Sequence, residues 1–152
     1  MSETYRGACH CGAVRFEVRL KGGLDSRRRC TCSYCAMRGA VAVTAAVGDL
    51  RILAGEDRLA LYRFNTGVAE HRFCSTCGIY THHRRRSNPD EYGVNVACLE
   101  GLSPFDFETV PVTDGARHPS DSGLGDAALD LGTLRFERRA NARAGKPEPP
   151  VR

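Results

Sequence analysis

Phe73-Cys74-Ser75-Thr76-Cys77-Gly78 is the stretch that decides the fold. Two residues separate its cysteines, and Gly78 can take the positive φ that turns backbone amides toward the sulfurs. Two thiolates on one zinc ion must lie within roughly 4 Å of each other, because each binds the metal at about 2.3 Å in a tetrahedron. The spacing therefore predicts a metal-binding turn that supplies two zinc ligands.

Two further cysteine clusters lie upstream of this turn. Cys9 and Cys11 are one residue apart, and in a strand such residues point to the same face, so both sulfurs can reach one ion. The segment Cys30-Thr31-Cys32-Ser33-Tyr34-Cys35 combines both spacings. Cys98, the eighth cysteine, follows Val94 and Val96 at alternate positions, which predicts a small buried apolar residue.

Seven clustered cysteines are more than the four that one zinc ion binds. Two ions would divide them into a set of four and a set of three. A set of four thiolates closes a structural site, whereas a set of three leaves one position for water or substrate. The spacings favour Cys9, Cys11, Cys74 and Cys77 as the four and Cys30, Cys32 and Cys35 as the three. A single ribbon-like site, which joins Cys74 and Cys77 to the 30–35 cluster, is the alternative.

The compartment expected from the sequence is the reducing cytoplasm. Residues 1–6 have no apolar stretch of the kind that a secretory signal contains, and no apolar run approaches the roughly 20 residues that cross a bilayer. Clustered cysteines in that compartment are more often metal ligands than disulfides or redox thiols. We therefore expect two zinc ions per chain and no membrane partner.

The net charge of +4 does not indicate a nucleic-acid partner for the folded part. Residues 137–152 hold five basic and two acidic side chains, which leaves a net charge of +1 for residues 1–136. The length of 152 residues fits one domain. The sequence predicts a zinc-binding domain over 1–136 and a flexible, basic, proline-containing tail over 137–152.

Short strands dominate the predicted secondary structure. Alternating or β-branched segments recur between turn residues, which is typical of a mainly β domain built from small antiparallel sheets. In Ser120–Leu131, Gly123 and Gly125 limit any helix. The predicted strands cover residues 14–18, 41–47, 50–53, 59–64, 71–73, 79–83 and 92–99.

Several charged and titratable residues lie near the cysteine clusters. His82 and His83 point to opposite sides of an extended segment, and one of them is a candidate fourth ligand or acid–base group, with a surface or packed histidine as the alternative. The run 27–29 of three arginines could attract carboxylates or form a solvated loop. A second arginine run, 84–86, is interpreted as part of a solvent-facing loop with residues 87–89.

The assembled pattern resembles the glutathione-dependent formaldehyde-activating enzyme family, also called the CENP-V/GFA domain, over roughly residues 5–120. The motifs that carry the resemblance are Gly7-Ala8-Cys9-His10-Cys11-Gly12-Ala13-Val14-Arg15-Phe16, Cys30-Thr31-Cys32-Ser33-Tyr34-Cys35 with Arg38-Gly39, Phe73-Cys74-Ser75-Thr76-Cys77-Gly78, Val94-Asn95-Val96-Ala97-Cys98-Leu99, Asp114-Gly115 and His118-Pro119. Family members often carry histidine at the position of Thr31.

This resemblance implies an Mss4-like β-tent of small antiparallel sheets around zinc. It implies a structural zinc at Cys9, Cys11, Cys74 and Cys77, and a catalytic zinc at Cys30, Cys32 and Cys35. The implied reaction joins the thiol glutathione to formaldehyde as S-(hydroxymethyl)glutathione, formally a carbon–sulfur lyase reaction in reverse. The likeness to Mss4 also implies an alternative function, a non-catalytic zinc module for protein interaction.

Overall fold

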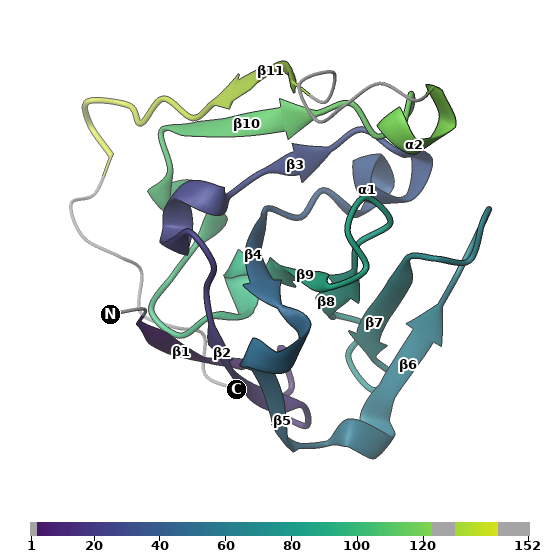
Figure 1. The fold of residues 1–152 in the computed structure, drawn as a ribbon. Helices are drawn as coiled ribbons and strands as arrows, with labels where there is room; N and C mark the ends of the chain where they lie inside the picture. Colours follow the sequence, from purple (N-terminus) through teal and green to yellow (C-terminus); the bar gives the residue numbers. More distant parts are fainter. Residues whose placement is uncertain (1–2, 123–129, 143–152) are drawn as a thin grey trace.

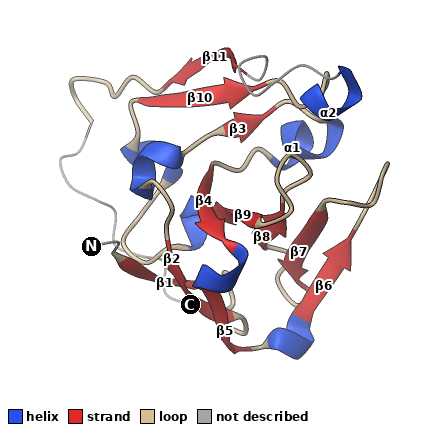
Figure 2. Cartoon of the chain, in the orientation of Figure 1, coloured by secondary structure: helices blue, strands red, loops and turns tan. Residues whose placement is uncertain are grey.

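Eleven strands in three small sheets form the framework of the computed structural model, which describes residues 3–122 and 130–142. The sheets surround a common interior, and the helices between them are short (Figures 1 and 2). The largest sheet has the antiparallel order β4-β9-β8-β7-β6. Its strands are β4 (Ala42–Ala46), β9 (Glu91–Asn95), β8 (Tyr80–Arg84), β7 (Glu70–Cys74) and β6 (Leu59–Tyr62).

The two smaller sheets have three strands each. One is the antiparallel set β1 (Thr4–Ala8), β2 (Arg15–Arg19) and β5 (Leu50–Ala54). The other places β10 (Thr109–Thr113) between β11 (Asp130–Arg135) and β3 (Arg29–Cys30). The β10–β3 pair is parallel, so a segment near residue 30 and another near residue 113 run side by side. This is a local exception to the predicted antiparallel pairing.

Short helices connect these strands. The α-helices are α1 (Ser33–Arg38) and α2 (Pro119–Ser122). Single 3₁₀ turns lie at Gly23–Ser26, Val47–Asp49, Glu56–Arg58, Val96–Cys98 and Pro104–Asp106. No helix among the described residues is long and apolar enough to cross a membrane.

The main hydrophobic core lies between the β2 face and the β4–β9 face. Its largest buried side chain is Phe16 of β2, which packs with valines from β4 and β9. Cys98 belongs to this core with 4% of its surface exposed, as predicted. Burial of these apolar side chains is the main stabilising contribution expected for a domain of this size.

The predicted strands are present, but two of them are shorter than expected. The strand predicted over 59–64 ends at Tyr62. The strand predicted over 92–99 ends at Asn95, and a 3₁₀ turn follows over Val96–Cys98. The Asn95 side chain accepts a hydrogen bond from the backbone N–H of Ala97, which favours a turn over continued pairing. Helix α2 begins at Pro119, while residues 123–129 and most of the predicted tail, 143–152, lie outside the described residues.

Candidate metal centres and the adjoining cavity

The four-cysteine set comes together as predicted. The Sγ atoms of Cys9, Cys11, Cys74 and Cys77 all lie within 4.8 Å of one another. Cys9 and Cys11 are 3.6 Å apart, and Cys11 and Cys74 are 3.8 Å apart, measured between sulfurs. These separations match a tetrahedron of thiolates around one ion with metal–sulfur bonds of about 2.3 Å. All four candidate ligand atoms are sulfur, the donor set typical of a structural zinc site.

Backbone amides stabilise the thiolates of this site. Gly78 has a φ of 75°, which folds the chain back so that its N–H reaches the Cys74 carbonyl at 2.8 Å. The Thr76 N–H donates to Cys74 Sγ at 3.4 Å. Burial raises the pKa of Cys77, but N–H donors from Cys11 and Ile79 and the neighbouring thiols outweigh it and lower that pKa to about 6. Cys77 is therefore a ready ligand at neutral pH.

Cys9 and Cys11 meet by a different route from the one predicted. Strand β1 ends at Ala8, and the two cysteines lie in the turn that leads to β2. Cys9 donates its N–H to the carbonyl of Val14, and the Val14 N–H donates to Cys9 Sγ at 3.3 Å. The same backbone contact recurs in the other turn, where the Cys74 N–H donates to the carbonyl of Ile79.

The three-cysteine set is also formed, at the junction of β3 and α1. The sulfurs of Cys30, Cys32 and Cys35 lie within 4.8 Å of one another. Cys32 is the N-cap of α1, and its Sγ accepts the N–H of Cys35 at 3.3 Å. The thiols of Cys30 and Cys35 donate toward Cys32 and hold its pKa well below the usual range. The chemistry and spacing of these three donors fit a zinc ion with one open position.

The loop after β10 packs against this cluster. Gly115 lies so close that a β-carbon there would overlap Cys30 Sγ, and the parallel β10–β3 pair brings the two together. Thr31 Oγ1 donates toward Asp114 Oδ1 at 3.4 Å and accepts the N–H of Ala116 at 3.4 Å. Thr31, the residue that differs from the common family pattern, therefore holds the loop in place by hydrogen bonds. Thr31 is not among the residues that line the cavity described next.

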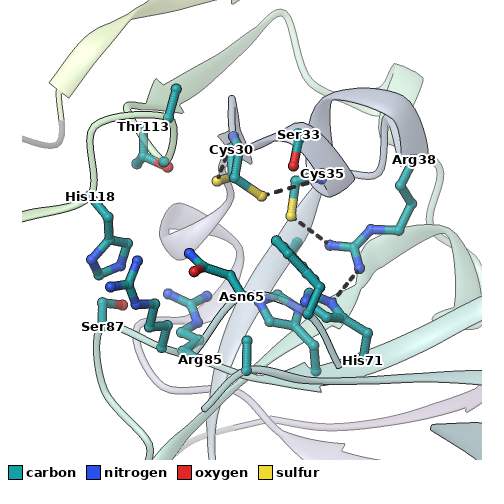
Figure 3. Close-up of a pocket in the computed structure, with 18 of the residues that line it drawn as sticks. Cys30, Ser33, Cys35, Arg38, Asn65, His71, Arg85, Ser87, Thr113 and His118 are labelled. Carbon is teal, nitrogen blue, oxygen red and sulfur yellow. Dashed lines mark hydrogen bonds between the residues drawn. The ribbon is translucent and has the colours of Figure 1, made fainter. Parts of the chain in front are cut away.

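A cavity of about 370 Å³ opens beside the three-cysteine cluster (Figure 3). This volume falls within the range of small-molecule sites. Cysteines of the four-cysteine site do not line it. The residues at its wall that carry charge or chemistry are Arg28, Cys30, Cys32, Cys35, Arg38, His71, His83, Arg85, Arg86, His118 and Asp121.

Arg38 connects the cysteine cluster to a histidine that the sequence interpretation did not single out. Its guanidinium donates to Cys35 Sγ at 3.2 Å and lies 3.1 Å from Nδ1 of His71 (Figure 3). The same group lies over the Tyr80 ring, 3.5 Å from its centroid, so its position is well defined. The arginine places positive charge beside a candidate metal ligand, as groups around metal sites commonly do.

The structure separates the two predicted histidines. His83 of β8 lines the cavity, whereas His82 faces the other side and packs its ring edge-on against Tyr92, with centroids 5.0 Å apart. Neither belongs to a metal-ligand cluster among the described residues. Cross-strand pairing sets His71 of β7 directly beside His83, and that pairing, once the register is known, is the signal that identifies His71.

The arginine run 84–86 is not the solvent-facing loop that was expected. Arg84 ends β8, and Arg85 is only 3% exposed, with Nη2 donating to Thr44 Oγ1 at 2.9 Å. Arg86 pairs with Asp121 of α2, and both residues line the cavity. In the other run, Arg28 lines the cavity, while Arg27 packs over the Phe107 ring and donates to the carbonyl of Thr109.

Comparisons with known proteins agree with this architecture. A protein of Halomonas elongata named "Putative glutathione-dependent formaldehyde-activating enzyme" is 34% identical over 79 residues, which are 47% of this chain and 50% of that protein. The chain thus spans about half the length of this relative. A crystal structure of a Rhodobacter sphaeroides protein is 59% identical, covers 71% of this chain and 99% of its own, and superposes with a TM-score of 0.70.

The family model described as "Glutathione-dependent formaldehyde-activating enzyme" matches residues 4–111. That range holds both cysteine clusters and most of the cavity wall. The chain belongs to the family of glutathione-dependent formaldehyde-activating enzymes.

Proposed function

We propose that the protein is a zinc-dependent carbon–sulfur lyase of the S-(hydroxymethyl)glutathione synthase type. In the synthetic direction it would add the thiol of glutathione to formaldehyde or a related small aldehyde. The observation that carries this proposal is the contrast between the two cysteine sets. The set of three opens into a cavity of about 370 Å³, whereas the set of four does not line it.

Cys30, Cys32 and Cys35 would hold the second zinc ion, and the other four cysteines the first. When bound, the ion in the three-cysteine site stabilises the thiolate form of a substrate thiol at neutral pH. Arg38 offsets negative charge on this cluster through its contact with Cys35. The remaining cavity residues position the substrate, which is the main contribution a protein makes to a simple addition.

The part of the cavity wall opposite the cysteine cluster is positively charged, which favours a substrate that carries carboxylates. Arg28, Arg85 and Arg86 line it, and Arg85 makes no ion pair with any carboxylate of the described residues. A buried guanidinium without an anion is costly, so a ligand carboxylate would stabilise it. Glutathione carries two carboxylates and one thiol. The cytoplasm is the proposed compartment, since thiols stay reduced there.

The decisive experiment is exchange NMR with glutathione and formaldehyde, with and without the purified protein. We expect the zinc-loaded protein to accelerate exchange beyond the spontaneous rate, and Cys32→Ser to abolish that acceleration without unfolding the domain. Cys98→Ala, which removes the one cysteine outside both clusters, is the matched control and should retain activity. Absence of acceleration by the loaded protein would refute the enzyme and favour the non-catalytic zinc module.

A further inference from the structure

Two stacked imidazoles form part of the cavity wall. His71 and His83 are directly opposed on β7 and β8, with ring centroids 5.1 Å apart and an interplanar angle of 20°. Gly93 of β9 faces His83 on the other side, and a β-carbon there would overlap the His83 ring. The glycine therefore leaves the space that the ring occupies, and the pair has a defined orientation in the sheet.

The partner of His71 defines its tautomer. Nδ1 of His71 lies 3.1 Å from Nη1 of Arg38, and a guanidinium can only donate hydrogen bonds. Nδ1 is therefore the acceptor, and in the neutral ring Nε2 carries the hydrogen. Within residues 3–122 and 130–142, this buried Nε2 has no hydrogen-bond partner. A buried donor without an acceptor is rare, and it indicates that a ligand or water oxygen completes the site.

The hydrogen-bond partner of His83 favours the opposite tautomer. Tyr80 has a single hydroxyl hydrogen, which it donates to the Gly93 carbonyl at 2.9 Å. Tyr80 Oη also lies 2.6 Å from Nδ1 of His83, and with its hydrogen on the Gly93 carbonyl the oxygen is left to accept a hydrogen bond from that nitrogen. Nε2 of His83 is then the unprotonated nitrogen. The two rings thus present one donor and one acceptor to their surroundings.

Burial keeps both rings neutral. Burial is the main cause that lowers the pKa of His71 to about 4, and the charge of Arg38 lowers it further. The pKa of His83 is also well below the ordinary value, again through burial first and Arg38 second. At neutral pH the donor and acceptor roles are therefore stable properties of the folded chain.

The geometry points to His71 and His83 as a binding subsite for the oxygen of a hydroxymethyl group. A hydroxyl oxygen can accept a hydrogen bond from His71 Nε2 while its hydrogen is donated to His83 Nε2. A carbonyl oxygen can use only the first of these contacts. The pair therefore distinguishes the thiol–aldehyde adduct from the free aldehyde, an assignment that rests on the proposed function.

During the addition, negative charge builds up on this same oxygen. The glutathione sulfur forms a bond to the aldehyde carbon, the carbonyl π bond breaks, and its electron pair moves to oxygen. The proton lost by the thiol ends on that oxygen through solvent, so the product is a neutral hydroxymethyl thioether. The Nε2–H of His71 stabilises the oxygen as its charge grows, and His83 accepts a hydrogen bond from the finished hydroxyl.

The first test measures the tautomers directly in the zinc-loaded protein. Long-range ¹H–¹⁵N NMR on histidine-labelled protein near pH 7 should show the Nε2–H form for His71 and the Nδ1–H form for His83. Signals are assigned with His71→Phe, His83→Phe and His82→Phe. The same tautomer in both rings, exchanged tautomers, or a charged ring would overturn the assignment whether or not the protein is an enzyme.

The second test adds three probes: glutathione, S-methylglutathione, and glutathione with formaldehyde. We expect the Nε2 signals of both rings to shift only with the last probe, because S-methylglutathione has no hydroxyl. Equal shifts with S-methylglutathione would overturn the subsite. If the signals respond as expected but the protein does not accelerate exchange, the proposed enzyme is refuted and the subsite stands.

Substitutions of His71 test whether the subsite contributes to the catalysed rate. His71→Phe preserves the stacked ring and should lower the catalysed rate about 10²–10³-fold, the usual effect of losing a donor to a growing oxyanion. His71→Gln restores a donor and should recover part of the rate. His82→Phe, on the same strand as His83 but outside the cavity, is the matched control. Equal rates in His71→Phe and His82→Phe would count against the role of His71.

Discussion

Gly115 and Cys30 are in such close contact that no side chain larger than hydrogen fits between them. Their contact joins the loop after β10 to the cysteine cluster at β3, across more than eighty residues of chain. Any substitution at Gly115 must therefore move either the loop or the Cys30 sulfur. The amount of zinc bound at the three-cysteine site is therefore a direct measure of this contact.

Gly115→Ala should reduce bound zinc from two ions per chain to one. The alanine β-carbon displaces a ligand of the three-cysteine site, while the four-cysteine site lies elsewhere and keeps its ion. Zinc analysis by mass spectrometry after gel filtration measures the change. Gly132→Ala, where an added β-carbon meets nothing within 4 Å, is the control and should bind two ions. Equal zinc in both variants would mean that Cys30 is not a ligand.

Cys77→Ser should destabilise the whole domain far more than Cys32→Ser. The four-cysteine site clamps the β1–β2 turn to the β7–β8 turn, and the binding energy of a structural zinc contributes directly to folding. We expect a loss of several kcal/mol, about 3 or more, for Cys77→Ser. Thermal unfolding followed by circular dichroism with zinc present measures it. Similar melting temperatures for the two variants would contradict the assignment of a structural and an open site.

Local sequence indicated the cysteine clusters but not their surroundings. The short spacings predicted the pairs Cys9–Cys11 and Cys74–Cys77 and the cluster at residues 30–35, and counting ligands joined the two pairs, whose Cys11 and Cys74 are 63 residues apart. The cavity wall instead depends on strand register. His71 meets His83 only through the β7–β8 pairing, and Gly115 meets Cys30 only through the parallel β10–β3 pair. No pattern within a short window indicates either contact.

Burial of charge was the second property that the sequence did not predict. A run of three arginines usually lies in solvent, and Arg84-Arg85-Arg86 was interpreted that way. The run begins at the end of β8, and the alternation of the strand continues far enough to turn Arg85 inward toward Thr44. The spacing of Cys9 and Cys11 likewise did not predict the local backbone, because either a turn or a strand can bring their two sulfurs together.

Arg38→Gln should weaken zinc binding at the three-cysteine site about 10–100-fold, the usual cost of removing a group that supports a metal ligand. The guanidinium donates to Cys35 Sγ and offsets the charge of the thiolate, whereas glutamine is neutral and shorter. Competition with a chromophoric chelator measures the affinity of the more weakly bound ion. Arg51→Gln, which breaks only an exposed pair with Glu17, is the control. An unchanged affinity in Arg38→Gln would show that the contact has no influence on the metal.

Arg85→Gln should impair the use of glutathione but not of a neutral thiol. If Arg85 binds a carboxylate of glutathione, its loss removes a charge-assisted hydrogen bond and raises KM about 10–100-fold. The rate with 2-mercaptoethanol, which has no carboxylate, should change little. Exchange NMR at varied thiol concentrations gives both values. Equal losses with the two thiols would mean that Arg85 has a structural role through Thr44 alone.

His82 makes the stability of the fold depend on pH between about 4 and 6.5. Burial, and to a lesser extent Arg72, lowers the pKa of His82 from 6.5 to about 4, so the native ring stays neutral where the unfolded chain binds a proton. The free energy of unfolding therefore rises with pH across this window, and the stabilisation is lost as the pH falls. Between pH 7.5 and pH 5 the His82 contribution should decrease by about 2 kcal/mol.

Urea unfolding of the wild type and of His82→Phe at both pH values isolates this contribution. Phenylalanine keeps the aromatic contact with Tyr92 but cannot bind a proton, so the variant should lose less stability on acidification than the wild type. Zinc loss and the titration of His71 affect both proteins alike, and they cancel in the difference between the two. Identical losses in the two proteins would show that His82 binds a proton as easily in the folded state as in the unfolded one, which its 4% exposure argues against.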